Sequence, residues 1–361
     1  MAYSLKRLKE EGIPPLLGGV KTAEDWEAKR KTITDRWLDA IGPIPGPVPV
    51  NARFFSIEKE SDHVRIHLKY ESVYGDWVTA YLLVPGDDGS RLTLTNLEES
   101  LFSPDSISVK RPAVLALHPT SPEGKDDVAL SSGRENRQYG LELVKRGYIV
   151  LAPDIITAGE RVKPGEEPYQ TASFYEDQPE WSAVAKMMAD HRQGVSLLSS
   201  MPGVAGIGAI GHSLGGYNSF FLAGMDTRVK AVVCSCGFAV FANDPERERW
   251  GRRSWFSHIP KISDYLANDE VPFEFNEIAA LAAPTPLFLW MGQKDKIFPH
   301  WEQAAAAVHD IDRLYAFLDA EHEFTSLIGN EGHDFPKEIR RMAYAFLDEK
   351  LQAPSDNCGN I

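Results

Sequence analysis

The chain has 361 residues, of which 43% are hydrophobic and 25% are charged, and its formal net charge is −14. This composition is typical of a globular protein with a sizeable core, and the length fits one large α/β domain with additions or two domains. The negative charge argues against nucleic acid or an anionic membrane as the main partner, and no apolar run approaches the ~20 residues that span a bilayer.

The first fifteen residues, MAYSLKRLKEEGIPP, contain charges but no apolar stretch of the kind found in secretory signals. The three cysteines, Cys234, Cys236 and Cys358, are an odd number, and the first two lie in an apolar run. This pattern indicates buried free thiols in a reducing compartment. No Cys/His cluster has zinc-ligand spacing. We therefore expect a cytoplasmic protein that uses no metal and no cofactor.

The N-terminal residues 1–52 are predicted to form a helical extension with a linker. Apolar side chains recur at helical spacing over residues 22–41, where Thr22 is a suitable N-cap and Gly42 ends the helix. The proline-rich residues 43–49 predict a stiff connection to the next part of the chain.

Three strand-like runs follow, at residues 53–59, 63–71 and 77–85. They are rich in β-branched and aromatic residues, and residues 74–76 provide a turn before the third run. We expect an antiparallel meander that leads into a larger sheet. The polar residues 86–111 are predicted to form a surface excursion.

From residue 112 the chain alternates between predicted strands and helices. The predicted strands are 112–118, 148–154, 203–211, 229–237, 284–292 and 313–319, and the predicted helices are 134–146, 182–200, one from 214, 300–308 and 336–351. This alternation is typical of an α/β domain with a mostly parallel sheet and helices on both faces. We assign that domain to residues 53–351, with residues 238–283 as a candidate lid insertion and residues 352–361 as a tail.

The stretch AIGHSLGGYNS, residues 209–219, contains the pattern G-x-S-x-G centred on Ser213. An apolar run precedes the pattern and an amphipathic stretch follows it, which is the strand–turn–helix setting of a nucleophile elbow. Ser213 is therefore the predicted nucleophile. The backbone amide of Leu214, at the start of the helix, is a candidate oxyanion donor.

A nucleophilic serine requires a base, and the base requires a group that orients it. Asp295 follows the next-to-last predicted strand, and His333 lies on the loop before the final helix, which is the chain order expected for acid and base. His322 is a rival base, but it lies between two glutamates and is expected to be exposed. His212 and His191 are interpreted as structural residues.

The second oxyanion donor is expected in the loop after the strand at 112–118. Pro119 has no N–H group, so the amide of Thr120 is the candidate. His118, which precedes this proline, is interpreted either as a pocket residue or as part of a turn that ends the strand.

Five segments in this order, LALHP, VLAPDIITAGER, GHSLGG, MGQKDKIFP and EGHDFP, resemble motifs of the α/β-hydrolase superfamily, and the resemblance covers residues 77–351. Within that superfamily the chain is most similar to acetyl xylan esterases and dienelactone-hydrolase-like enzymes, which are related to the catalytic domains of prolyl oligopeptidases. The resemblance implies an α/β-hydrolase fold, a triad of Ser213, Asp295 and His333, and hydrolysis through an acyl-enzyme.

The sequence departs from these relatives at three places. The elbow holds a serine where dienelactone hydrolase itself has a cysteine. His118-Pro119 stands where many relatives have His-Gly, and Ala158 stands where relatives often have an aromatic residue. The last two departures affect the expected pocket and leave the substrate open.

Candidate substrate-binding residues lie in the insertion and in the loop after residue 154. Glu160 and Arg161 in that loop are interpreted either as pocket residues or as a structural ion pair. In the insertion, four arginines alternate with Trp250 and Trp255, and they form either a clamp for a carboxylate or phosphate or a solvated face or intersubunit contact. The four arginines are Arg247, Arg249, Arg252 and Arg253.

The sequence thus predicts a serine hydrolase that cleaves a carboxylic ester, with an acetyl or other small acyl group on a carbohydrate or aryl alcohol. A serine peptidase of the aminopeptidase or acyl-peptidase kind is the alternative, because it would share the triad. An inactive binding relative is disfavoured, since all three triad members are present in order. The expected partner is a small-molecule ester, without nucleic acid or membrane, and a homo-oligomer is compatible with the sequence.

Overall fold

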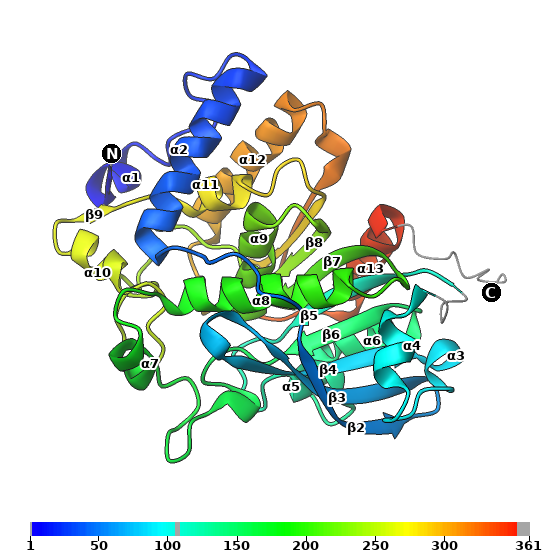
Figure 1. The fold of residues 1–361 in the computed structure, drawn as a ribbon. Helices are drawn as coiled ribbons and strands as arrows, with labels where there is room; N and C mark the ends of the chain where they lie inside the picture. The colour runs from blue at the N-terminus through cyan, green and yellow to red at the C-terminus, as the bar shows by residue number, and fades with distance from the viewer. Residues whose placement is uncertain (1, 105–108, 352–361) are drawn as a thin grey trace.

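The computed structural model describes residues 2–104 and 109–351 (Figure 1), so the predicted tail lies outside the described residues. Within that part of the chain, a nine-stranded sheet has the order β11-β10-β8-β7-β5-β6-β4-β3-β2. In this order, the neighbouring strands β11, β10, β8, β7, β5 and β6 are parallel to one another. Strands β4, β3 and β2 extend the sheet beyond β6 with antiparallel pairing. The predicted α/β fold class, with a mostly parallel sheet entered through an antiparallel meander, is confirmed.

The strands of this sheet are β2 (Ala52–Lys59), β3 (His63–Glu71), β4 (Trp77–Pro85), β5 (Arg111–Leu117), β6 (Ile149–Pro153), β7 (Val204–His212), β8 (Val229–Ser235), β10 (Leu287–Gly292) and β11 (Phe324–Gly329). Two short strands, β1 (Tyr3–Ser4) and β9 (Glu270–Val271), pair with each other elsewhere.

The longer helices are α2 (Ala23–Ile41), α8 (Ala183–Ser199), α9 (Leu214–Met225), α12 (Trp301–Phe317) and α13 (Lys337–Leu351). The shorter α-helices are α1 (Leu5–Glu10), α3 (Gly86–Gly89), α4 (Leu97–Phe102), α5 (Asp126–Ala129), α6 (Tyr139–Lys145), α7 (Ala172–Asp177), α10 (Lys261–Leu266) and α11 (Phe275–Ala280). Single turns of 3₁₀ helix within the described residues are η1 (Val73–Gly75), η3 (Glu135–Arg137), η4 (Gly159–Arg161) and η5 (Glu321–Glu323).

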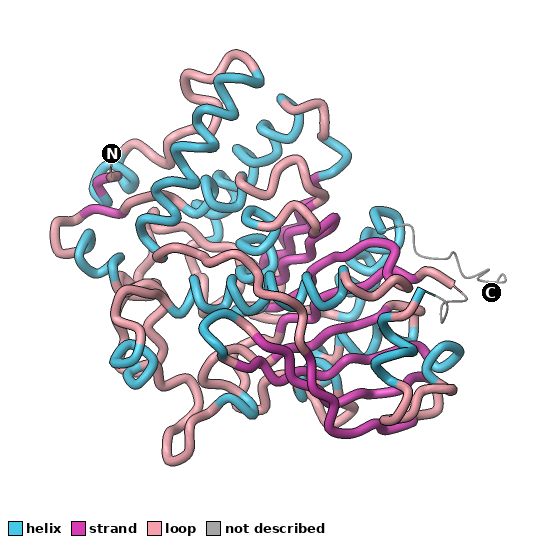
Figure 2. The backbone as a smooth tube through the Cα atoms, in the orientation of Figure 1, coloured by secondary structure: helices cyan, strands magenta, loops and turns pink. Residues whose placement is uncertain are grey.

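The hydrophobic pattern of each strand matches its place in the sheet. Every residue of β6 and β10 is buried, because helices cover both faces of a parallel sheet. In β3 buried residues alternate with half-buried ones over most of the strand, as expected for a strand with one solvated face. Helices α8 and α9 pack on one face and α6 and α13 on the other (Figures 1 and 2).

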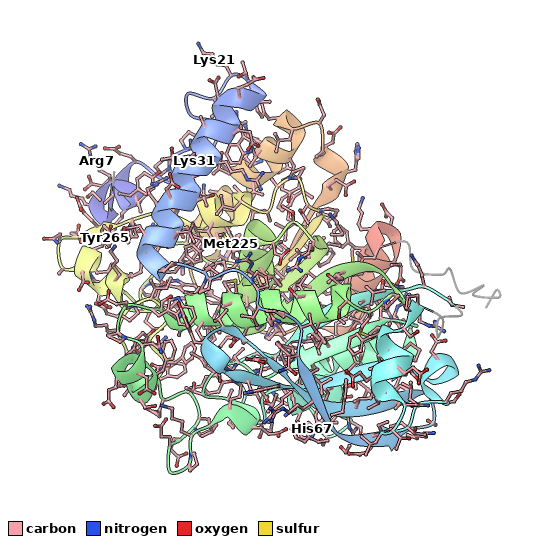
Figure 3. All side chains as sticks on the ribbon, viewed as in Figure 1. Arg7, Lys21, Lys31, His67, Met225 and Tyr265 are labelled. Atoms are coloured by element: carbon pink, nitrogen blue, oxygen red, sulfur yellow. The ribbon has the colours of Figure 1, made fainter. Side chains whose placement is uncertain are left out.

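The predicted N-terminal helix is present as α2. The Thr22 hydroxyl accepts the Asp25 N–H at 3.2 Å, and the Asp25 carboxylate accepts the Thr22 N–H at 3.0 Å, which completes a capping box. The helix buries the aromatic side chains of Trp26 and Trp37 and ends at Gly42, whose φ is 94°. Lys31 of this helix and Lys21 just before it point outward (Figure 3), whereas Arg36 on the packed side bonds the carboxylate of Glu277 at 2.7 Å.

The insertion predicted at 238–283 contains α10, β9 and α11. It forms a core with the N-terminal segment: α2 packs against α10 and α11, and β1 pairs with β9 through Tyr3 and Val271. Most of its apolar side chains are buried. The insertion is therefore packed into the body of the protein over much of its length, and only residues 245–258 contribute to the cavity described below.

One predicted strand was wrong. Residues 313–317 belong to α12, and the last strand is β11, which begins at Phe324. The buried residues Ile311, Leu314 and Tyr315 continue the apolar face of α12 at helical spacing, so the aromatic run had the period of a helix. In β11, at the sheet edge, only Phe324 is buried, so its sequence lacks the apolar signature of a strand.

Candidate active site

Ser213 lies at a sharp turn between β7 and α9, with φ 54° and ψ −117°. A positive φ is costly for a residue with a side chain. The surrounding glycines make the turn possible: a Cβ on Gly211 would lie 2.1 Å from the carbonyl carbon of Gly215, and a Cβ on Gly215 would lie 1.9 Å from the Leu117 carbonyl oxygen. The G-x-S-x-G pattern is thus required by the contact of β7, α9 and β5.

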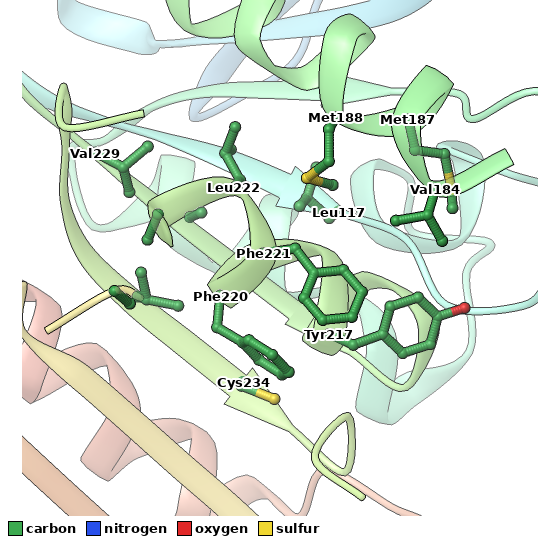
Figure 4. Packing of buried hydrophobic residues seen from close by; sticks show 14 of the residues in the cluster. Leu117, Val184, Met187, Met188, Tyr217, Phe220, Phe221, Leu222, Val229 and Cys234 are labelled. Carbon is green, nitrogen blue, oxygen red and sulfur yellow. The ribbon is translucent and has the colours of Figure 1, made fainter. Parts of the chain in front are cut away.

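The turn is anchored on both sides. The Ser213 N–H donates to the Ser235 carbonyl oxygen of β8 at 2.8 Å. The side chains of α9 fill the core beneath, where Phe220 and Phe221 lie between α8 and β8 (Figure 4). The serine is therefore presented from a rigid support at the carboxyl edge of the sheet.

Asp295 and His333 are hydrogen-bonded, with 2.6 Å between Asp295 Oδ2 and His333 Nδ1. Asp295 Oδ1 accepts the backbone N–H groups of Ile297 at 2.7 Å and Phe298 at 3.0 Å. These two bonds fix the plane of the carboxylate, so its second oxygen is aimed at the imidazole. Burial raises the pKa of the Asp295 carboxyl, but these hydrogen bonds and the His333 charge outweigh it, and the pKa lies below the ordinary value.

His212 and Cys236 surround this pair. The His212 ring centroid lies 4.8 Å from that of His333, and its Nδ1 is 2.9 Å from the Ser235 hydroxyl oxygen. Burial holds the pKa of His212 well below its ordinary value, so the ring is neutral. The Cys236 thiol, Asp295 and His333 have possible ligand atoms within 4.8 Å of one another. Burial raises the pKa of Cys236 to about 12, so it is a protonated thiol.

A cavity of about 550 Å³ lies over Ser213 and His333. Both candidate oxyanion residues, Thr120 and Leu214, line it, and no hydrogen bond from either backbone amide is found within the described residues. No hydrogen bond joins Ser213 and His333 in that same part of the chain; such bonds often tighten only when substrate binds. Aromatic and basic side chains complete the walls, namely Arg134, Arg137, Tyr217, Arg249, Trp250, Arg253, Trp255, His258, Lys296 and Phe298.

The arginines of the insertion divide into two groups. Arg249 and Arg253 line the cavity, and Glu246 bridges them, with its Oε2 3.1 Å from Arg249 Nη1 and its Oε1 2.6 Å from Arg253 Nη2. Arg247 and Arg252 are exposed and pair with Asp269 and Asp264 respectively, away from the cavity. The substrate-binding assignment of Arg252 is therefore corrected, because its side chain points to solvent.

Three further predicted substrate-binding residues lie outside the cavity walls. His118 is fully buried, and its two ring nitrogens contact backbone groups. Glu160 contacts Lys125 and His67, which lies on the outer face of β3 (Figure 3). Arg161 is a structural ion-pair residue, whose side chain is 7% exposed and bonds Asp190 and Asp76. Trp250 and Trp255 do line the cavity.

Sequence reasoning missed several cavity residues. Arg134 and Arg137, at η3, line the wall near His333, and Arg137 Nη1 is 2.7 Å from the carboxylate of Asp334. Tyr217 and His258 share a hydrogen bond of 2.8 Å on another wall. No motif marks these residues, since each comes from a segment that only the fold brings to the site. The rival base His322 is exposed and lies outside the cavity.

A family model described as "Dienelactone hydrolase family" matches residues 131–345. Among curated proteins, "Putative hydrolase YtaP" from Bacillus subtilis (strain 168) is 26% identical over 248 residues, which are 66% of this chain and 79% of that protein.

Two solved structures extend the likeness to nearly the whole chain. A glucuronoyl esterase from Solibacter usitatus has a TM-score of 0.66 at 16% identity, covering 94% of this chain and 97% of its own. Acetyl xylan esterase 1 from Thermoanaerobacterium sp. JW/SL YS485 has a TM-score of 0.56 at 17% identity, covering 90% of this chain and 94% of its own. At these identities the likeness establishes a common fold.

Proposed function

Because this chain belongs to the dienelactone hydrolase family and is a carboxylic ester hydrolase, we propose that it works through an acyl-enzyme on Ser213. The observation that carries this proposal is the Asp295–His333 hydrogen bond of 2.6 Å at a cavity that also holds a serine in a strained turn. The positive φ of Ser213 supports the same role, since strained backbone at a non-glycine residue is found most often at functional sites.

In the proposed reaction, His333 Nε2 takes the proton of the Ser213 hydroxyl as the oxygen attacks the ester carbonyl carbon. Asp295 keeps the other imidazole proton on Nδ1 and stabilises the imidazolium. The amides of Leu214 and Thr120 bind the oxyanion. The intermediate expels the alcohol, which takes the proton from His333, and a water molecule then repeats these steps on the acyl-enzyme.

The proposed substrate is an ester of a small acyl group, such as acetate, with a carbohydrate or aryl alcohol. The cavity of about 550 Å³ is roomy enough for such a compound, and the aromatic residues Trp250, Trp255 and Tyr217 line it. The two esterases with the same fold are named for glucuronoyl and acetyl xylan substrates, which supports a sugar ester.

The test is Ser213→Ala, assayed on p-nitrophenyl acetate, acetylated sugars and an aminoacyl amide. We expect loss of turnover by at least about 10³-fold with an unchanged melting temperature, and we expect a fluorophosphonate probe to label the wild type only. Ser219→Ala is a matched control, because that hydroxyl is also buried on α9 but bonds the Gly216 carbonyl at 2.6 Å. Activity of Ser213→Ala close to wild type would refute the proposal, and a preference for the amide would favour the peptidase alternative.

A further inference from the structure

Two buried side chains lie behind the loop that presents the Thr120 amide. His118 has no exposed surface and Tyr169 is 4% exposed, and neither lines the cavity. The mechanism above uses neither residue. Both nevertheless direct polar atoms at the backbone of Pro119 and Ser121, the two neighbours of Thr120.

The tautomer of His118 follows from its two contacts. Nε2 accepts the Ile155 N–H at 3.2 Å, so this nitrogen carries no proton. The proton is therefore on Nδ1, which donates to the Pro119 carbonyl oxygen at 2.7 Å. Burial lowers the pKa of His118, so the neutral ring keeps one donor and one acceptor.

The Tyr169 hydroxyl makes three contacts to the same loop. Its oxygen accepts the Ser121 N–H at 2.7 Å. Its proton faces the Ser121 carbonyl oxygen at 2.9 Å and the Pro119 carbonyl oxygen at 3.3 Å. The phenol ring is held edge-on against Trp255 and Phe256, with centroid distances of 6.2 Å and 5.7 Å.

These contacts fix the direction of the Thr120 amide. The Pro119 carbonyl and the Thr120 N–H belong to one planar trans peptide, so the N–H points opposite to the carbonyl oxygen that His118 and Tyr169 hold. The Ser121 N–H belongs to the next peptide. Both peptide planes that flank the Thr120 Cα are thus held, while Thr120 itself is exposed to the cavity.

We propose that His118 and Tyr169 are positioning residues that aim the Thr120 N–H at the oxyanion of the tetrahedral intermediate. Neither side chain touches the substrate; each acts through the backbone of the 119–121 loop. An oxyanion donor stabilises the transition state without reorganisation only if it is fixed beforehand, and these two side chains supply that rigidity. The inference rests on the proposed acyl-enzyme mechanism and assigns to His118 a role distinct from the substrate contact predicted for it.

The test is Tyr169→Phe, which removes all three hydroxyl contacts and keeps the ring. We expect kcat to fall about 10- to 100-fold, which does not exceed the decrease caused by removing a complete oxyanion donor. KM should stay within about twofold of the wild-type value. A trifluoromethyl ketone inhibitor, which forms an oxyanion when Ser213 adds to it, should lose affinity by the same factor as kcat/KM. The affinity for the product sugar alcohol, which has no carbonyl or carboxylate oxygen for this amide to bind, should not change.

Tyr175→Phe is the matched control. The Tyr175 hydroxyl also accepts a backbone N–H, that of Ala183 at 2.9 Å, and donates to a carbonyl oxygen, that of Ser257 at 2.8 Å. It makes no contact with the 119–121 loop. The two variants should lose similar stability, but only Tyr169→Phe should lose kcat and affinity for the ketone.

If Tyr169→Phe fails to fold, His118→Asn and His118→Leu decide the matter. The asparagine amide can replace the Nδ1 donor and leucine cannot, so kcat of the asparagine variant should be about tenfold higher. Tyr169→Phe with wild-type kcat, or with reduced kcat but unchanged ketone affinity, overturns the inference, and so do equal kcat values in the two His118 variants. An inactive Ser213→Ala beside a fully active Tyr169→Phe would refute only this inference, whereas an active Ser213→Ala would refute the mechanism beneath it.

Discussion

At the scale of single residues, the serine of the elbow depends on neighbours that have no side chain. Ser213 is held at φ 54°, a conformation that costs about 1–3 kcal/mol at a non-glycine residue. Gly211 is positioned so that any Cβ would meet the backbone of Gly215 and no flexible side chain. Backbone atoms cannot move aside without separating β7 from α9, so the cost of a Cβ there cannot be relaxed locally.

We therefore expect Gly211→Ala to destabilise the protein by about 1–3 kcal/mol or more and to lower kcat by moving Ser213. Gly206→Ala is the control, since it lies on the same strand and its Cβ would have only an ordinary contact, 3.7 Å from Leu351. Urea unfolding and steady-state kinetics measure both effects. Equal stability of the two variants would show that the glycine contact is not a constraint.

The candidate triad could be predicted from the sequence because each member follows a strand, and parallel strands end at one edge. His118 and Arg161 could not be placed in the same way. Arg161 bonds Asp190 on α8 at 2.9 Å and Asp76 before β4 at 2.6 Å. A local pattern does not contain such partners, so only the folded chain separates an ion pair from a pocket residue.

At the scale of elements, the insertion supplies one wall of the cavity through residues 245–258. Its arginines were predicted either to clamp an anion or to form a solvated face, and the fold divides them. Arg249 and Arg253 face the cavity, but the carboxylate of Glu246 already lies between them. Arg249 also bonds Asp244 at 2.6 Å and 2.8 Å, so the charge of the two cations is balanced by two carboxylates, of which only Glu246 lies on the cavity wall.

Glu246→Gln distinguishes the two interpretations. If the arginines contact the substrate, removal of the Glu246 carboxylate should lower the ratio of KM for an anionic ester to KM for a matched neutral ester. We expect a decrease of up to about fivefold, because a partly exposed ion pair contributes about that much. High salt should reduce this difference. Glu248→Gln is the control, because Glu248 bonds the Ser263 hydroxyl outside the cavity. A ratio equal to that of the wild type would show that the two arginines do not contact the substrate.

Element boundaries were less predictable than element order. The predicted strand–helix alternation agrees with the structure up to α12, whose last residues have aromatic side chains at helical spacing and are not the predicted strand. The insertion was found from the gap it leaves in the alternation. Its packing against α2 could not be predicted, because hydrophobic residues show that a helix face is covered without showing by which segment.

At the scale of the whole molecule, ion pairs join elements that are distant in the chain. The Asp76 carboxylate, before β4, lies 2.6 Å from both Arg161 Nη2 of η4 and Lys186 Nζ of α8. Burial raises the pKa of Asp76, but the charges of Arg161 and Lys186 outweigh it and lower the pKa to about 2. An ionised Asp76 therefore helps to fix the meander onto the central sheet.

This shift predicts the acid behaviour of the protein. A carboxyl with a lower pKa in the folded state stabilises the fold above the unfolded pKa of about 3.9, and the stabilisation is lost as the pH falls towards 2. Asp76→Asn should therefore lower the melting temperature at pH 7 and flatten its decline between pH 4 and pH 2. Asp35→Asn, which breaks the exposed Lys31–Asp35 pair, should change neither. Parallel melting curves for Asp76→Asn and the wild type would contradict this account.

The pairing of the N-terminal segment with the insertion has a consequence for synthesis on the ribosome. Tyr3 bonds Glu277, 274 residues later in the chain, and at roughly 5–20 residues per second this span takes on the order of 15–50 s to translate. During that time the side chains of Trp26 and Trp37, which are fully buried in the folded protein, lack part of the surface that they pack against. The nascent chain thus offers chaperones an apolar helix early, and the cavity wall at residues 245–258 can close only after most of the sheet has been made.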